Sequence, residues 1–183
     1  KRKGQHRVVQ ALPTLLHSFP SIHYHMVGIA DAKGPVEALA AKLGMEHKIT
    51  FHGRIPSLQN LAGLYRSSNV FIMLSENQPD GEVEGFGIAI LEANYFGLPA
   101  IGSKGCGISD AIIDGYNGRL VDGSDPGVIR DALKDIIENF DTYSVHAREW
   151  ANRHDWNRLL EYFLRNETPA FLNMPPPESI ART

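Results

Sequence analysis

The feature that most constrains this chain is the alternation of short apolar runs with segments of helical periodicity. Val70–Leu74 (VFIML) is a continuous apolar run of the kind found in strands buried on both faces. Similar β-rich runs begin near residues 22, 49, 100 and 119. Strands that alternate with helices predict a parallel α/β sheet with helices on both faces and right-handed crossovers. We therefore expect a three-layer α/β fold.

The helical segments between these runs are recognised from apolar residues recurring every three or four positions. Helices are expected over residues 5–19, 36–43, 58–65, 87–96, from about 109, and 126–140. In the last of these, Asp125 and Pro126 are suited to the N-cap and the first helical position. The length of 183 residues corresponds to about one domain of ordinary size. We assign residues 1–166 to this domain and residues 167–183, with Pro175–Pro177, to a proline-rich tail.

Composition excludes several other classes of protein. Hydrophobic residues make up 43% of the chain and charged residues 21%, which is ordinary for a globular domain. The net charge of -3 gives no reason to expect nucleic-acid binding. Cys106 is the single cysteine, so no intrachain disulfide or cysteine-rich zinc site can form, and a reducing cytoplasm is the expected compartment. No apolar run approaches the roughly 18 residues that a membrane span needs.

The loop that follows Val70–Leu74 carries the clearest chemical signal. In open parallel sheets, ligands bind beyond the carboxyl ends of the strands. Here Gly85 and Gly87 immediately precede the helix expected at 87–96, so backbone N–H groups and the positive helix end are open to an anion. The helix dipole contributes only about 0.3–1 kcal/mol at an exposed site, so additional cations are expected. A phosphate group is the natural ligand of this loop.

Two carboxylates, Glu84 and Glu92, bracket this predicted anion site in E-x7-E spacing. Eight helical positions would separate them by roughly 12 Å along a helix axis, although the loop at Glu84 shortens or bends that distance. The paired carboxylates of glycoside hydrolases stand about 5–9.5 Å apart, so a hydrolase pair is the less natural interpretation. Carboxylates that each bind a different sugar ring, with phosphates between them, describe a nucleotide-sugar site.

Several segments together resemble one known family. They are EGFGIAILEA at 84–93, the residues up to Ile101, Gly105–Asp110, and GYNGRLV at 115–121. This pattern resembles the C-terminal, donor-binding domain of retaining family 4 glycosyltransferases of the GT-B type, and the likeness extends from Lys3 to about Asn139. The resemblance implies a Rossmann-like sheet that forms the C-terminal half of a GT-B fold. Cys106 and Asp110 stand where the family usually has glycine and glutamate.

The resemblance also implies roles for individual residues. Glu84 would hold the transferred sugar and Lys3 would neutralise the diphosphate; these two are the expected catalytic residues. Glu92 would bind the ribose hydroxyls. The remaining expected substrate-binding residues are the loop amides at the sugar and distal phosphate, and a loop at the nucleobase: Gly85, Phe86, Gly87, Ile88, Gly53, Arg54 and Ile55.

The implied function is transfer of a sugar from a nucleoside-diphosphate sugar to an acceptor hydroxyl with retention of anomeric configuration. No cofactor and no metal are expected. The acceptor would be bound by an N-terminal domain absent from this chain, without which the isolated domain would be inactive. The expected location is the cytoplasm, or the inner face of a membrane if the absent domain binds one. We also expect a first strand, from residues before Lys1 or from another chain, without which strand edges of the sheet stay unpaired.

Other interpretations of the sequence stay open. The chain could be a nucleotide-sugar-binding module without activity by itself, because fold alone does not separate an enzyme from its binding half. An NAD-dependent oxidoreductase is disfavoured because the segment from Gly85 to Ile90 lacks the third glycine of G-x-G-x-x-G. His23 and His25 share one face of a predicted strand, as two metal ligands could, but no third ligand is evident.

Overall fold

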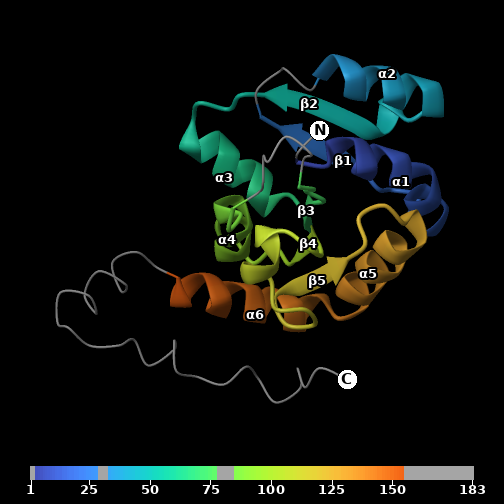
Figure 1. Ribbon diagram of the computed structural model, residues 1–183. Helices are drawn as coiled ribbons and strands as arrows, with labels where there is room; N and C mark the ends of the chain where they lie inside the picture. The colour runs from blue at the N-terminus through green and yellow to red at the C-terminus, as the bar shows by residue number, and fades with distance from the viewer. Residues whose placement is uncertain (1–2, 29–32, 78–84, 155–183) are drawn as a thin grey trace.

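The computed structural model describes residues 3–28, 33–77 and 85–154, which form two parallel sheets (Figure 1). Strand β1 (Tyr24–Val27) pairs with β2 (Ile49–Gly53). The second sheet has the order β3-β4-β5, with β3 at Phe71–Met73, β4 at Ala100–Ser103 and β5 at Gly118–Val121. All of these pairings are parallel, as the alternation of strands and helices predicts.

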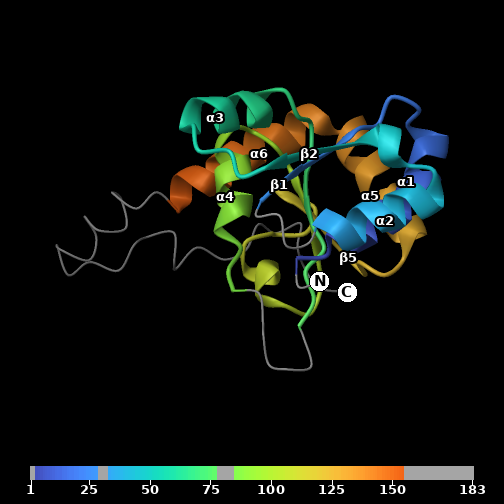
Figure 2. The same cartoon turned by 90° about the horizontal axis from the view of Figure 1, so that it is seen from above.

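Helices lie on both sides of the strands. Both views place α1, α2 and α5 on one side and α3, α4 and α6 on the other (Figures 1 and 2). Their bounds are α1 Gln5–Ser18, α2 Lys33–Leu43, α3 Leu58–Arg66, α4 Ile88–Tyr95, α5 Pro126–Glu138 and α6 Phe140–Arg153. Two short 3-10 helices, η2 (Glu46–Lys48) and η3 (Gly107–Asp110), complete the described elements. The expected three-layer α/β arrangement is confirmed.

The local signals explain where helices begin. The Asp125 side chain accepts hydrogen bonds from the amides of Gly127 and Val128, and Pro126 occupies the first turn of α5, as predicted. The Ser57 side chain caps α3 by accepting from the amide of Asn60. In α5 the cap precedes a buried apolar face formed by Ile129, Ala132 and Ile136, whereas no residue of α3 is fully buried.

Among the described residues, the core has three clusters, two of which include residues of α1. Val8 and Leu15 of α1 pack with the three-stranded sheet and α5, whereas Val9 and Leu12 pack with α2 and β2. A further cluster, around Ile90, joins α4 to β3 and β4. Burial of each such side chain contributes about 1.5–3 kcal/mol to stability. Because α1 contributes buried side chains to the clusters beside both sheets, it is the element that holds the two sheets together. Across the described residues, no helix has the length and apolar character needed to span a membrane.

Strands β1 and β3 belong to separate sheets and are not paired with each other. The sequence predicts unpaired edges at this place, because in the expected winding order the first strand stands at the centre of the sheet. The described strands form a two-stranded sheet, β1-β2, and a three-stranded sheet, β3-β4-β5, and whether another strand lies between them stays a prediction.

The prediction of a helix from about residue 109 is wrong. Only the 3-10 turn η3 forms there, and the chain then runs irregularly to β5. The reason is the buried Asn117 side chain, which accepts from the amide of Ile113 at 2.7 Å and donates to the carbonyl of Ala111 at 3.0 Å. The indole of Trp150 also donates to Ala111. These bonds use backbone groups that a continuing helix would need.

The other differences are small. The first predicted strand begins at Tyr24 instead of Ile22, and the run Val70–Leu74 is a strand only over Phe71–Met73. The last predicted helix ends at Glu138, and α6 follows it directly. The tail assigned to 167–183 lies outside the described residues.

Candidate functional site

A pocket of about 330 Å³ lies beyond β3, where the sequence predicts the ligand site. We call it the Lys3 pocket. It is lined by one cation, one strand residue and the start of α4: Lys3, Met73, Gly85, Phe86, Gly87, Ile88 and Ala89. The structure therefore brings together Lys3 and the predicted loop residues, which are more than 80 positions apart in the chain.

Lys3 is placed by the residue that follows it. Gly4 has φ +71, and a Cβ added to it would stand 1.9 Å from the carbonyl oxygen of Leu74. The backbone at the start of α1 thus rests directly on the chain after β3, which only glycine permits. An ion pair between Arg7 and Glu76 fastens the same two segments one turn further along.

The start of α4 is open to an anion. Gly87 is its N-cap, with φ 80 and no side-chain capping bond, and the first turn contains no acidic residue. The first amides of a helix have no partner within the helix, so this end presents N–H donors and a partial positive charge. A Cβ on Gly87 would stand 3.1 Å from Ile90 Cδ1 and 3.3 Å from Met73 Cε. The left-handed conformation favours glycine here, and a Cβ would require the ends of the Ile90 and Met73 side chains to shift.

Glu92 lies on the exposed face of α4, one turn beyond Ile88. This is a helical rise of roughly 6 Å. The Tyr65 hydroxyl, from α3, donates a hydrogen bond to Glu92 Oε2 at 3.2 Å. Burial, the charge of Glu92 and this hydrogen bond raise the pKa of Tyr65 well above its usual value, so the phenol stays neutral. Glu92 is close to the Lys3 pocket along α4 but is not among the residues that line it.

The other predicted site residues are not among the described residues that line the Lys3 pocket. Glu84 lies outside the described residues. Gly53 ends β2 with φ +63, and its carbonyl accepts from the amide of Gly28 at the end of β1. Gly53, Arg54 and Ile55 do not line the Lys3 pocket.

Sequence reasoning missed the role of Tyr65. Its position in the predicted helix 58–65 was visible, but nothing in the local pattern pairs it with a glutamate 27 residues later. Only the packing of α3 beside α4 brings the phenol to the carboxylate.

A histidine that sequence reasoning missed, His52, joins the predicted pair on the β1-β2 sheet. His25 Nδ1 and His52 Nε2 are hydrogen-bonded at 3.0 Å, and His23 Nε2 bonds to Thr50 Oγ1 at 2.8 Å. Among the residues that the structure describes, no group of three or more His, Cys, Asp or Glu side chains is arranged to hold a metal ion.

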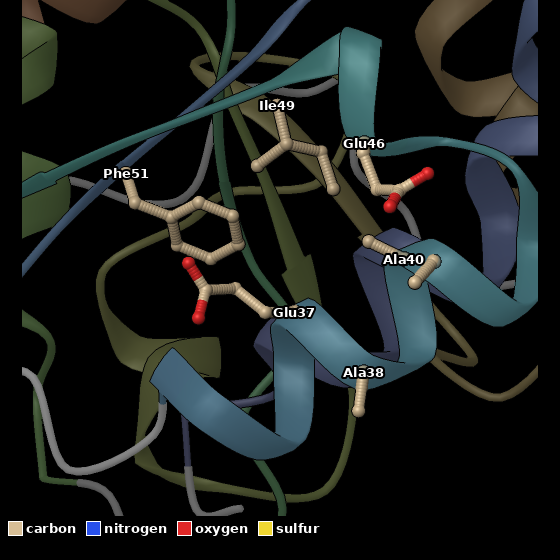
Figure 3. A pocket seen from close by; sticks show the side chains of 7 residues that line it. Glu37, Ala38, Ala40, Glu46, Ile49 and Phe51 are labelled. Atoms are coloured by element: carbon tan, nitrogen blue, oxygen red, sulfur yellow. The ribbon is translucent and has the colours of Figure 1, made fainter.

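A larger pocket, of about 510 Å³, lies between α2, η2 and β2 (Figure 3). We call it the α2 pocket. Its lining is apolar apart from Glu37 and Glu46, and Figure 3 shows the Glu37 carboxylate beside the Phe51 ring. Two carboxylates and no cation make this lining unfavourable for phosphate. The smaller Lys3 pocket is therefore the better candidate for the anion site.

The loop after β4 supports the base of the loop after β3. Asn77 donates to the carbonyl of Gly105 at 3.1 Å, and Ser103 donates to the carbonyl of Ser75. The thiol of Cys106 lies 3.7 Å from the carbonyls of both Ser75 and Ser103, where it acts as a weak donor. These contacts make Cys106 part of the scaffold beneath the site.

Comparison with known proteins agrees with this geometry. The model of the glycosyl transferases group 1 family matches residues 1–153. A GDP-mannose-dependent alpha-(1-6)-phosphatidylinositol monomannoside mannosyltransferase of Mycolicibacterium smegmatis is 30% identical over 154 residues, which are 82% of this chain and 40% of that protein. The chain thus spans well under half the length of this relative.

Solved structures share the fold at lower identity. HepE of Anabaena, in complex with UDP and glucose, has a TM-score of 0.72 at 21% identity, over 90% of this chain and 45% of that one. The C-terminal domain of LpcC, a group 1 family protein of Francisella tularensis, has a TM-score of 0.68 at 23% identity, over 83% of this chain and 79% of that one. These likenesses establish a fold shared with GT-B glycosyltransferases. From the family match over residues 1–153, we conclude that the chain belongs to the group 1 glycosyl transferases.

Proposed function

We propose that this chain binds the donor in a retaining glycosyltransferase that moves a sugar from a nucleoside-diphosphate sugar to an acceptor hydroxyl. The observation that carries the proposal is the Lys3 pocket, which is lined both by a cation and by the uncapped start of α4. The names of two related proteins support the donor class. HepE was solved with UDP and glucose, and the mycobacterial relative is named as GDP-mannose-dependent.

The charges of the pocket suit departure of a diphosphate. When the bond from the sugar carbon to the diphosphate oxygen breaks, negative charge grows on the diphosphate. Lys3 and the amides of Gly85–Ile88 would stabilise this charge by donors fixed in advance, which is an efficient form of catalysis. Neutralisation by Lys3 and helix amides would make a metal ion unnecessary.

Each end of the donor has a proposed partner outside this anion site. Glu92, one turn along α4, would accept hydrogen bonds from the ribose hydroxyls. Glu84 would bind hydroxyls of the transferred sugar. Gly53, Arg54 and Ile55, which follow β2, would border the nucleobase.

The acceptor and the complete reaction depend on more than this chain. We propose that an N-terminal domain binds the acceptor, and that the chain alone binds donor without transferring sugar. The cytoplasm is the proposed location, at the inner face of a membrane if the acceptor-binding domain attaches there. The alternative is a nucleotide-sugar-binding module with no transfer activity.

A thermal-shift panel tests donor binding. UDP-, GDP- and ADP-sugars are each added to the chain, and one class is expected to raise Tm. A ligand at 100 times its Kd stabilises by about 2.7 kcal/mol, which corresponds to roughly 5–10 °C for a chain of this size. At the same ligand concentration, Lys3→Ala should reduce the shift to about half, whereas Lys42→Ala on α2 should leave it intact. If no donor raises Tm, the proposal is wrong.

Transfer to acceptors separates the main proposal from the alternative. Sugar release is measured with the isolated chain and with the same chain joined to an acceptor-binding domain. Donor binding with transfer only in the joined protein supports the enzyme half. Donor binding without transfer in either form supports the binding module.

A further inference from the structure

The pairing of Tyr65 with Glu92 joins two helices at the proposed ribose site. The Tyr65 hydroxyl donates to Glu92 Oε2 at 3.2 Å, and the two residues are 27 positions apart. Glu92 is exposed on α4, where a glutamate by itself would sample several rotamers. The phenol selects among these orientations.

The Tyr65 ring is itself held in place. It stacks on Phe96, with ring centroids 5.3 Å apart and an interplanar angle of 14°. Phe71 packs against it at 6.5 Å, and the guanidinium of Arg66 covers the Phe96 ring. The donor to Glu92 thus comes from a ring in contact with Phe71 of β3 and with Phe96 at the end of α4, and Arg66 of α3 lies over the second of these rings.

A tyrosine orients a carboxylate without neutralising it. A lysine or arginine in its place would carry a positive charge and form a strong ion pair with Glu92. The carboxylate would then be a weaker acceptor for hydrogen bonds from a ligand. The phenol supplies one neutral O–H, so the carboxylate keeps its charge and most of its roughly four acceptor positions. Those positions suffice for two neighbouring hydroxyls of a ligand.

We propose that Tyr65 is a positioning residue that aims the Glu92 carboxylate at the vicinal hydroxyls of a ribonucleotide, and thereby makes this site selective for ribose over deoxyribose. The inference rests on the proposed donor-binding function and adds a residue and a selectivity to it. Tyr65 acts through Glu92 and needs no contact with the nucleotide.

The test measures sugar discrimination by titration calorimetry. UDP and GDP are each compared with their 2′,3′-dideoxy analogues, which lack the hydroxyls. Wild type should prefer the ribonucleotide by about 10- to 100-fold, since hydrogen bonds to a charged group are lost in the analogue. Tyr65→Phe keeps the ring stack and should weaken ribonucleotide binding by about 3- to 10-fold, leaving dideoxynucleotide binding unchanged.

Two further variants separate positioning from general stability. In Glu92→Gln, adding Tyr65→Phe should cause little further loss, because the two residues act on the same hydroxyls. Tyr143→Phe is the matched control, since the Tyr143 hydroxyl donates to Asp135 at 2.6 Å in a tyrosine–carboxylate pair of α5 and α6. That variant should lower Tm without changing the preference for ribose.

The outcomes separate the donor-binding proposal from the positioning role of Tyr65. If wild type binds neither UDP nor GDP, the donor-binding proposal and this inference both fail. If wild type binds them but Tyr65→Phe keeps the wild-type ribose preference, or weakens both nucleotide types equally, the positioning role alone is overturned.

Discussion

Gly4 packs against Leu74 so closely that a Cβ on Gly4 would stand 1.9 Å from the Leu74 carbonyl oxygen. This contact joins the start of α1 to the end of β3, and it places Lys3 at the pocket formed by the start of α4. Both the stability of this junction and the geometry of the anion site therefore depend on residue 4 being a glycine.

Gly4→Ala should be strongly destabilising. Alanine would meet the Leu74 backbone and would also have to adopt φ +71, so we expect a loss of about 3 kcal/mol or more. Urea unfolding measures the loss. Gly63→Ala in α3 is the matched control, because no atom lies within 4 Å of the added Cβ and the helix favours alanine by about 0.5–1 kcal/mol. Equal unfolding free energies for the two variants would contradict the packing described.

Lys3→Ala should weaken binding only of ligands that carry phosphate. Because Lys3 is exposed, we expect a loss near the lower end for charge-assisted bonds, about tenfold in Kd for UDP or GDP. Uridine and guanosine should bind as they do to wild type. Calorimetry with each nucleoside and its diphosphate provides the comparison, and an equal loss for both would place Lys3 away from the phosphates.

Asn117→Ala should destabilise the segment between η3 and β5. The Asn117 side chain is fully buried and donates to Asn94 Oδ1 at 2.7 Å, besides its bonds to Ala111 and Ile113. Removing it leaves buried polar partners unsatisfied, at a cost of about 2–4 kcal/mol. Asn60→Ala, on the exposed surface of α3, should change the unfolding free energy by no more than about 0.5 kcal/mol. Similar losses in the two variants would show that the buried network contributes little.

Protonation of His25 should lower stability in mildly acidic solution. Burial first, and then the neighbouring His23 and His52, lower the pKa of His25 below 6.5. The unfolded chain then binds more protons than the folded one, so this contribution is present above pH 6.5 and decreases as pH falls toward the folded-state pKa. His25→Asn should flatten the dependence of unfolding free energy on pH in this window. An unchanged slope would show that His25 does not couple folding to protonation.

Asp135 provides an internal reference at lower pH. Although burial opposes it, hydrogen bonds from Tyr143 and Arg119 hold the pKa of Asp135 below 3.8. Its contribution is present above that value and is lost as pH falls below it. The two transitions are therefore separated in pH, and His25→Asn should affect only the upper one.

The strands and most of the helices could be predicted from the sequence, because apolar runs, helical periodicity and capping residues all depend on residues that are close together in the chain. The apolar run Val70–Leu74 contains β3, and Asp125 with Pro126 starts α5 where expected. The helix expected from 109 failed because Asn117 takes backbone groups that no local pattern reveals as occupied.

The site was predictable only in part for the same reason. Lys3 and Gly85–Ile88 follow from motifs, and the structure places them around one pocket. The Tyr65–Glu92 pair depends on how α3 packs beside α4, and the contact of His25 with His52 depends on strand pairing. Such contacts between distant segments are decided by tertiary packing.

The most direct test is a crystal structure of the chain with a UDP- or GDP-sugar bound. The account predicts that the diphosphate lies against the amides of Gly85–Ile88 beside Lys3, with the ribose hydroxyls on Glu92. A nucleotide bound elsewhere, such as in the α2 pocket, with the start of α4 unoccupied would contradict it.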